Sequence, residues 1–91
     1  MGQPQLPPQT PLPDAPRAQH LGDLARADVR WHVYLETVKE GQTARGRVHF
    51  VSGARHRTSG WIFLEWSEQA VVDRFGDFSP AELWKLLESL G

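Results

Sequence analysis

The stretch RGRVHFVSGARHRTSGWIFLEW, Arg45 to Trp66, determines how the rest of this 91-residue chain is expected to fold. It contains four arginines, two histidines, four of the nine aromatic residues and a single acid. Its two ends alternate apolar and polar residues, which is the period of a strand with one buried face. The glycine- and serine-containing segment between them predicts a loop, so the stretch is expected to form a β-hairpin.

Residues 30–38, RWHVYLETV, show the same alternation just before this stretch. Trp31, Val33 and Leu35 occupy one side of the expected strand, so we expect that side to be buried. A polar turn that contains Gly41 separates the two segments. Three successive strands with short polar loops predict an antiparallel meander.

The hydrophobic pattern also predicts how the strands pair, because a slip of one residue would turn every buried side chain toward solvent. We place the two loops at residues 39–44 and 53–59. The expected inner pairs are Leu35 with Val48, Val33 with Phe50, Phe50 with Ile62, and Val48 with Leu64. The expected outer rows are Glu36, Arg47 and Glu65; Tyr34, His49 and Phe63; and His32, Val51 and Trp61. The first row sets opposite charges side by side, which supports this register.

The C-terminal segment FSPAELWKLLESLG, residues 78–91, predicts a helix. Ser79 is a typical N-cap, Pro80 suits the first helical position, and Glu82 completes a capping box. Four leucines recur at helical spacing and form a stripe that needs a buried partner: Leu83, Leu86, Leu87 and Leu90. The apolar face of the sheet is the expected partner.

Residues 68–75, EQAVVDRF, leave two alternatives open. We expect a fourth strand, because the segment follows the third strand after Ser67 and Glu68, which suit a two-residue turn. The alternative is a helix that Ser67 caps and Gly76 ends.

The N-terminal part of the chain differs in composition from the rest. Residues 1–16 contain six of the seven prolines, so we expect a disordered proline-rich tail over residues 1–19. Residues 20–28 are expected to be a linker or short helix, and the alternative is that residues 18–28 fold back over the outer face. The expected architecture is a small α+β domain over residues 29–91. It consists of an antiparallel meander of three to four strands, packed on one face by a C-terminal α-helix.

Composition narrows the function classes. The chain has no cysteine, which excludes disulfides, thiolate metal ligands and cysteine nucleophiles. No apolar run is long enough for a membrane span, and the first 20 residues lack a signal-peptide pattern, so we expect a cytoplasmic protein without membrane contact. The net charge of −1 conceals a segment, residues 44–60, with four arginines and no acid.

The sequence shows no motif of an active site or a cofactor site. A small sheet with one helix also offers little concavity for a small-molecule substrate. His32 and His49 fall in different outer rows, and no carboxylate completes a set of three metal ligands. His20 and His56 fall in the tail and in a loop. We therefore expect no enzyme, no cofactor and no metal site.

The outer face of the sheet is the expected binding surface, because it is too apolar for an ordinary solvated face. We expect a non-catalytic interaction module or accessory subunit that binds a protein partner, or a second copy of itself, through that face. The alternative is single-stranded nucleic-acid binding, in which the aromatic side chains stack on bases and the arginines of the 55–57 loop hold phosphates. The candidate binding residues are Tyr34, Trp61, Phe63, His32, His49, Arg45, Arg55 and Arg57.

Overall fold

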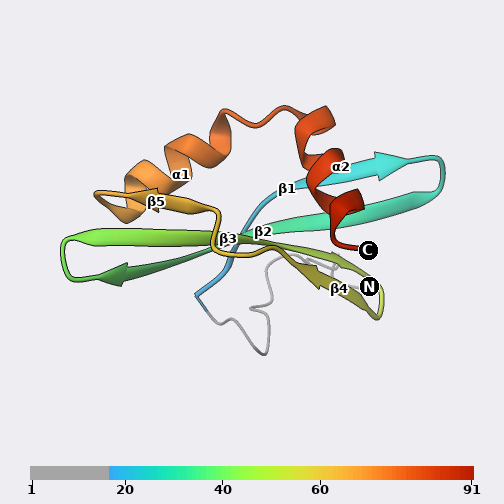
Figure 1. Cartoon of the computed structure of the whole chain (residues 1–91). Helices are drawn as coiled ribbons and strands as arrows, with labels where there is room; N and C mark the ends of the chain where they lie inside the picture. The colour runs from blue at the N-terminus through green and yellow to red at the C-terminus, as the bar shows by residue number, and fades with distance from the viewer. Residues whose placement is uncertain (1–16) are drawn as a thin grey trace, which may run out of the picture.

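Residues 17–91, which the computed structural model describes, form one antiparallel sheet with two helices over the same face (Figure 1). The sheet order is β1-β2-β3-β4, and β5 also pairs with β3. The elements are β1 (Gln19–Arg26), β2 (Val29–Glu40), β3 (Thr43–Ser52), β4 (Arg55–Thr58), β5 (Phe63–Glu65), α1 (Glu68–Gly76) and α2 (Pro80–Ser89). This confirms the predicted α+β class with its antiparallel meander and C-terminal helix. Of the predicted disordered tail, residues 1–16 lie outside the described residues.

Strand β1 stands where a linker or short helix was predicted for residues 20–28. It pairs antiparallel with β2, and Leu24 points into the core with 4% of its surface exposed. The helix-like spacing of Leu21 and Leu24 reflects a β-bulge at Leu21, where one extra residue interrupts the alternation. Ala18, just before β1, packs against Tyr34, so the chain here covers part of the outer face.

The hairpin of β2 and β3 has the predicted register. The inner pairs are Leu35 with Val48 and Val33 with Phe50, and none of these four residues is more than 1% exposed. The outer pairs are Glu36 with Arg47, Tyr34 with His49, and His32 with Val51. The turn is tighter than predicted, because the strands continue until Glu40 pairs with Thr43.

The second predicted hairpin is wrong, because residues 55–58 form strand β4 instead of a loop. Gly53, whose φ is +59°, and Ala54 make a two-residue turn, and Ser52 pairs with Arg55 directly after it. Glycine adopts this left-handed conformation without the steric cost that a side chain adds. The chain therefore turns back at once after β3.

Strand β5 consequently pairs with the opposite end of β3. Phe63 lies opposite Gly46, rather than opposite His49 as predicted. Phe63 is buried, with 5% of its surface exposed. Ile62 and Leu64, which were predicted to be inside, are exposed instead, and Trp66 is exposed as well. The prediction reversed the two sides of this segment, because β4 and the irregular residues 59–62 intervene between the turn and β5.

Residues 68–76 form helix α1, so the predicted fourth strand is wrong and the alternative helix is confirmed. Ser67 is the N-cap, and its side-chain oxygen accepts a hydrogen bond from Ala70 N at 3.0 Å. Val71 and Phe75 lie four residues apart on one helical face and are both buried.

Helix α2 has the predicted capping box. Ser79 N donates to Glu82 Oε1 at 2.8 Å, and Glu82 N donates to Ser79 Oγ at 3.1 Å. Leu87 is buried, and the other three leucines of the stripe and Trp84 pack around the core. No helix within residues 17–91 is long and apolar enough to cross a bilayer.

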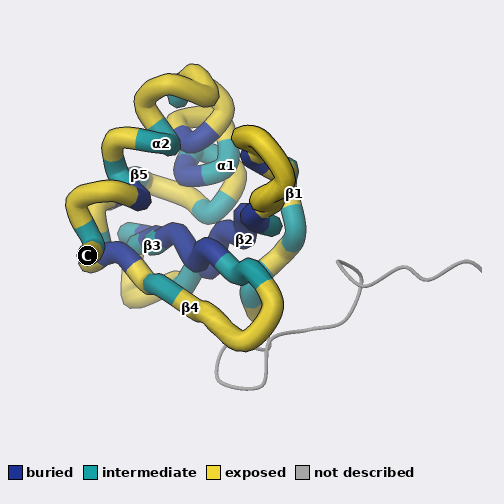
Figure 2. The backbone as a smooth tube through the Cα atoms, turned by 90° about the vertical axis from the view of Figure 1, so that its right-hand side faces the viewer, coloured by how far each residue is buried: buried dark blue, intermediate teal, exposed yellow. Residues whose placement is uncertain are grey.

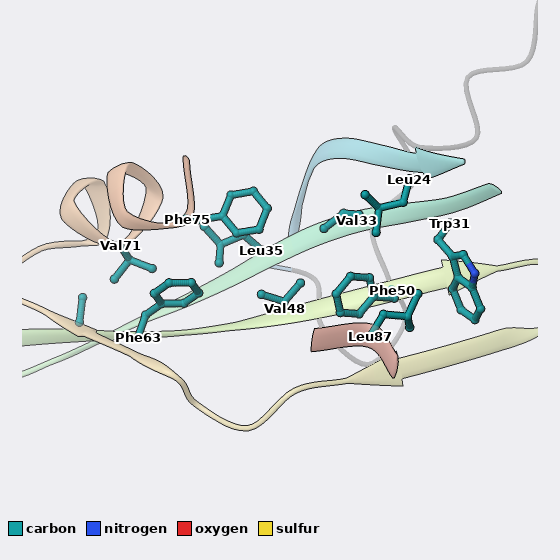
Figure 3. Packing of buried hydrophobic residues seen from close by; sticks show 11 residues of the cluster. Leu24, Trp31, Val33, Leu35, Val48, Phe50, Phe63, Val71, Phe75 and Leu87 are labelled. Carbon is teal, nitrogen blue, oxygen red and sulfur yellow. The ribbon is translucent and has the colours of Figure 1, made fainter. Parts of the chain in front are cut away.

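The core fills the space between the two helices and the inner face of the sheet (Figure 3). Figure 2 shows that the buried backbone positions are concentrated in the central strands β2 and β3. The fully or nearly fully buried apolar residues are Leu24, Trp31, Val33, Leu35, Ala44, Val48, Phe50, Phe63, Val71, Phe75 and Leu87. The opposite face of the sheet, which the helices leave uncovered, is the outer face.

Candidate functional site

All four histidines of the chain lie on the outer face. One comes from each of the strands β1 to β4: His20, His32, His49 and His56. Strand pairing sets them in two adjacent rows, which are Asp23, His32, Val51 and His56, and His20, Tyr34, His49 and Thr58. The sequence-based prediction did not bring these side chains together, because it included neither β1 nor β4.

His20, Asp23 and His32 bring two imidazoles and one carboxylate together. His20 Nε2 lies 2.7 Å from Asp23 Oδ1, and His32 Nδ1 lies 2.9 Å from the same oxygen. Arg30 Nη1 donates to the other oxygen, Asp23 Oδ2, at 3.0 Å. The predictions that His20 lies in a tail and that no carboxylate completes a set of three ligands are therefore wrong.

The bulge at Leu21 places His20 and Asp23 on the same face. Residues three apart in a regular strand point to opposite faces. Here His20 pairs with Tyr34 and Asp23 pairs with His32, because Leu21 is left out of the pairing. Tyr34 and His32 are two residues apart and share the outer face, so their partners share it too.

The surroundings of Asp23 favour its charged form. Burial by itself would raise the pKa of this carboxyl, but hydrogen bonds from His20, His32 and Arg30 outweigh burial and lower the pKa to about 2. The three side chains of the cluster are sheltered but reachable, with His20 24%, Asp23 26% and His32 25% exposed.

A second polar network runs from Glu36 to His56. Arg47 Nε donates to Glu36 Oε1 at 2.7 Å, and His49 Nε2 donates to the same oxygen at 2.8 Å. His49 Nδ1 then accepts a hydrogen bond from His56 Nε2 at 2.9 Å. The network assigns these tautomers, since a neutral imidazole donates from one nitrogen and accepts at the other.

Burial determines the protonation of this second network. The side chain of His49 is 3% exposed, and burial lowers its pKa against the opposing effect of the Glu36 carboxylate. Burial would raise the pKa of Glu36, but hydrogen bonds from Arg47 and His49 outweigh burial and lower it. His49, a predicted binding residue, is thus a buried structural group.

Trp61 lies on the outer face as predicted, but two arginines engage it. The guanidinium of Arg47 lies 4.3 Å from the centroid of the ring, and that of Arg45 lies 5.2 Å from it. Arg47 also binds Glu36, and Arg45 binds Glu40 at 2.9 Å. Neither arginine is therefore a free cation.

The predicted aromatic platform does not form on the outer face. Tyr34 is 4% exposed, because Ala18 and Val51 pack against it. Phe63 points to the inner side, where its ring makes an edge contact with Phe78 at 5.5 Å. Neither ring offers a face on which a base could stack.

The predicted loop arginines lie on the helix side of the sheet. Arg57 pairs with the inner-face residue Phe50, and Arg55, two residues away, shares its side of β4. The guanidinium of Arg55 lies 4.9 Å from the Trp31 ring, and Arg57 lines a small hollow together with Trp84. The structure therefore separates Arg55 and Arg57 from the outer-face candidates.

Three exposed apolar side chains extend the outer face beyond Trp61. Ile62, Leu64 and Trp66 are 47%, 65% and 76% exposed. Leu64 lies opposite Arg45, which places it on the outer side of β5, and Ile62 and Trp66 flank the strand two residues away on either side. We call these three residues the β5 stripe.

A hollow of about 450 Å³ lies beside the β5 stripe. Residues 62–65 line one side of it, and the opposite side is formed by Arg74, Asp77, Phe78 and Glu82. Glu65, predicted to lie beside Arg47, instead lies 3.4 Å from Arg74, so these two charges neutralise each other. Asp77 and Glu82 leave the hollow with an excess of negative charge.

Comparisons with known proteins identify no relative of this chain. No family model matches it, and no match was found among curated proteins or solved structures.

The sequence contains an indication of each feature that the prediction left out. Gly53 and Ala54 could form a two-residue hairpin turn. A turn at this point predicts a strand directly after it, which is β4, and it moves the next strand further along the chain, so that the β5 stripe is exposed. Gly22 inside a strand-like segment indicates a bulge, which would have joined His20 with Asp23. Both signals are weak by themselves, because glycine marks many kinds of loop.

Proposed function

We propose that this protein is a non-catalytic interaction module that binds an extended segment of a protein partner along the free edge of β5. The observation that carries the proposal is the β5 stripe, with three large apolar side chains exposed at alternate positions. Contiguous exposed apolar groups of this kind are typical of interaction sites. The proposal keeps the predicted function and moves its site from Tyr34, Trp61 and Phe63 to Ile62, Leu64 and Trp66.

The backbone of β5 supports binding by strand addition. Within residues 17–91, β5 pairs only with β3, so its other edge offers unpaired N–H and C=O groups. An extended peptide that pairs with such an edge gains main-chain hydrogen bonds, and its alternate side chains reach the two faces. The hollow beside residues 62–65 leaves room for this added strand.

The charges of the hollow favour a basic partner. An added strand would point every second side chain toward Asp77 and Glu82 and the remaining ones toward the β5 stripe. The segment that fits best therefore alternates lysine or arginine with apolar residues. A second copy fits less well, because symmetric pairing of β5 with itself would bring two acidic hollows toward each other.

The nucleic-acid alternative has less support. Tyr34 and Phe63, which were to stack on bases, are 4% and 5% exposed. Arg55 and Arg57 lie on the opposite side of the sheet from Trp61. A cytoplasmic location stays a prediction from the composition.

A peptide-display selection on the full chain tests the proposal. Random nine-residue peptides are enriched on the wild type, and the selected peptides are then measured against Leu64→Ser with Trp66→Ser. We expect peptides that alternate basic and apolar residues, and at least tenfold weaker binding to the double variant. Arg55→Ala with Arg57→Ala is the matched control and should bind normally.

Three outcomes would overturn the proposal. They are the enrichment of no peptide, peptides that bind the double variant equally well, and a stable homodimer that Leu64→Ser with Trp66→Ser dissociates. Sedimentation of the wild type and the double variant identifies the last of these.

A further inference from the structure

We propose that His20, Asp23 and His32 bind one divalent transition-metal ion of the zinc type on the outer face of β1 and β2. This site is independent of the proposed partner binding. Figure 1 shows β5 at one end of the sheet and the β1–β2 turn at the other, so one site can fail its test without affecting the other.

The donor set selects the class of metal. Zinc binds imidazole nitrogen and carboxylate oxygen, and sites with three protein ligands leave a fourth position to water. Magnesium and calcium require mostly oxygen ligands, of which this cluster offers one carboxylate. Two imidazoles and one carboxylate therefore favour zinc and its neighbours among the transition metals.

The distances suit such an ion after a small adjustment. The three donor atoms lie within 4.8 Å of one another. In a tetrahedral site with bonds of about 2.0–2.1 Å, two donors lie about 3.3 Å apart. His20 Nε2 and His32 Nδ1 lie 2.7 and 2.9 Å from Asp23 Oδ1, so each must move about half an ångström away from this oxygen. The two nitrogens, which lie no more than 4.8 Å apart, must reach the same separation of about 3.3 Å. An ion would take the place of the two protons that now hold these hydrogen bonds.

The ligands come from paired backbone rather than from loops. Asp23 and His32 are directly opposite each other in the β1–β2 ladder, and the bulge at Leu21 brings His20 to the same side. Ligands on regular elements keep their geometry better than ligands on loops. The site is therefore largely formed before an ion binds.

Arg30 acts as a positioning residue for the carboxylate. Its Nη1 donates to Asp23 Oδ2, which orients the side chain so that Oδ1 faces the two imidazoles. The positive charge of Arg30 opposes a second cation nearby. However, its side chain is 61% exposed, so solvent screens much of this repulsion.

A purely structural hydrogen-bond cluster would make the same contacts without ever taking an ion, so a metal titration separates the two cases. The full chain, prepared without a histidine tag and treated with a chelator, is titrated with zinc chloride in a calorimeter. We expect one zinc ion per chain. The imidazole NMR signals of His20 and His32 should shift, while those of His49 and His56 stay in place.

Variants then identify the ligands. Loss of a group that orients a metal ligand costs roughly 10- to 100-fold in metal affinity. Asp23→Asn and His32→Gln each alter a ligand itself, so each should weaken zinc binding by at least about this factor. His56→Gln, which alters another histidine of the outer face, should bind zinc as the wild type does.

The proposal is wrong if the wild type binds no stoichiometric zinc, or if His56→Gln weakens binding as much as His32→Gln. It is also wrong if all four histidine signals shift together. The wild-type NMR titration answers the question even where a variant does not fold.

Discussion

Gly46 on β3 lies directly beneath Val71 on α1, and a Cβ atom at Gly46 would overlap Val71 Cγ1. Phe63 of β5 packs against the same glycine, and its Cβ would lie 3.4 Å from the added atom. The absence of a side chain at this one position therefore lets α1 and β5 both approach β3.

Gly46→Ala should lower the free energy of unfolding by about 1–3 kcal/mol, because an extra methyl group in a packed core forces its neighbours apart. Urea unfolding followed by tryptophan fluorescence measures the change. Gly60→Ala is the control, since a Cβ at Gly60 meets nothing within 4 Å. Equal stability of both variants would contradict the close packing of α1 on β3.

The reversed sides of the β5 segment lead to a second prediction. Phe63→Ala removes a buried ring and should cost about 3–5 kcal/mol. Leu64→Ala removes an exposed side chain and should change the free energy of unfolding by no more than about 0.5 kcal/mol. Chemical denaturation of the two variants distinguishes this arrangement from the sequence-based one, in which the costs would be exchanged.

Ser59 supports the irregular segment between β4 and β5. Its Oγ accepts a hydrogen bond from the buried Val48 N at 2.9 Å. Ser59→Ala leaves this N–H without its partner and should cost about 1–3 kcal/mol. Ser89→Ala, which removes an exposed hydroxyl on α2, serves as the control and should be nearly neutral. A neutral Ser59→Ala would show that Val48 N finds another acceptor.

The buried His49 predicts how stability depends on pH. Its pKa in the folded state lies below the usual value of about 6.5, so below that pH the unfolded chain takes up a proton that the folded chain does not. The contribution of His49 to the free energy of unfolding is therefore fully present above about pH 6.5, and it is lost as the pH falls toward the pKa of the folded state. The contributions of Asp23 and Glu36, whose pKa values are also lowered, are lost only below about pH 4.

The difference in unfolding free energy between the wild type and His49→Gln isolates this contribution. We expect it to shrink between about pH 7 and pH 5, because the variant has no proton to take up at this position. A difference that stays constant over this range would show that the pKa of His49 is the same in the folded and unfolded chains, and one that grows as the pH falls would show that the folded protein binds the proton more tightly.

Much of the fold follows from local rules that the sequence displays openly. Glu36 and Arg47 carry opposite charges at positions that also put Val33, Leu35, Val48 and Phe50 inside, so two independent criteria agree on one register. The last helix has its cap and its leucine stripe within one continuous segment. Neither case depends on residues far away in the chain.

The rest of the fold depends on one tight turn and one bulge, which leave little trace in the pattern of apolar and polar side chains. Arg55 to Thr58 have no apolar alternation, because β4 is an edge strand of four residues that adds no residue to the buried core. Because the prediction omitted β4, it placed Ile62 and Leu64 on the inner face and Phe63 on the outer face, which is the reverse of the structure. The candidate site was lost in the same way, since the exposed stripe was placed inside and Asp23 was never brought next to His32.

The bulge at Leu21 lets β1 hold one extra residue without changing which of its paired side chains lie on the outer face. Deleting Leu21 would leave His20 and Asp23 two residues apart in a regular strand, so both would keep their places opposite Tyr34 and His32 on the outer face. Loss of the codon for Leu21 would therefore make β1 more regular and leave the three donor residues on one face.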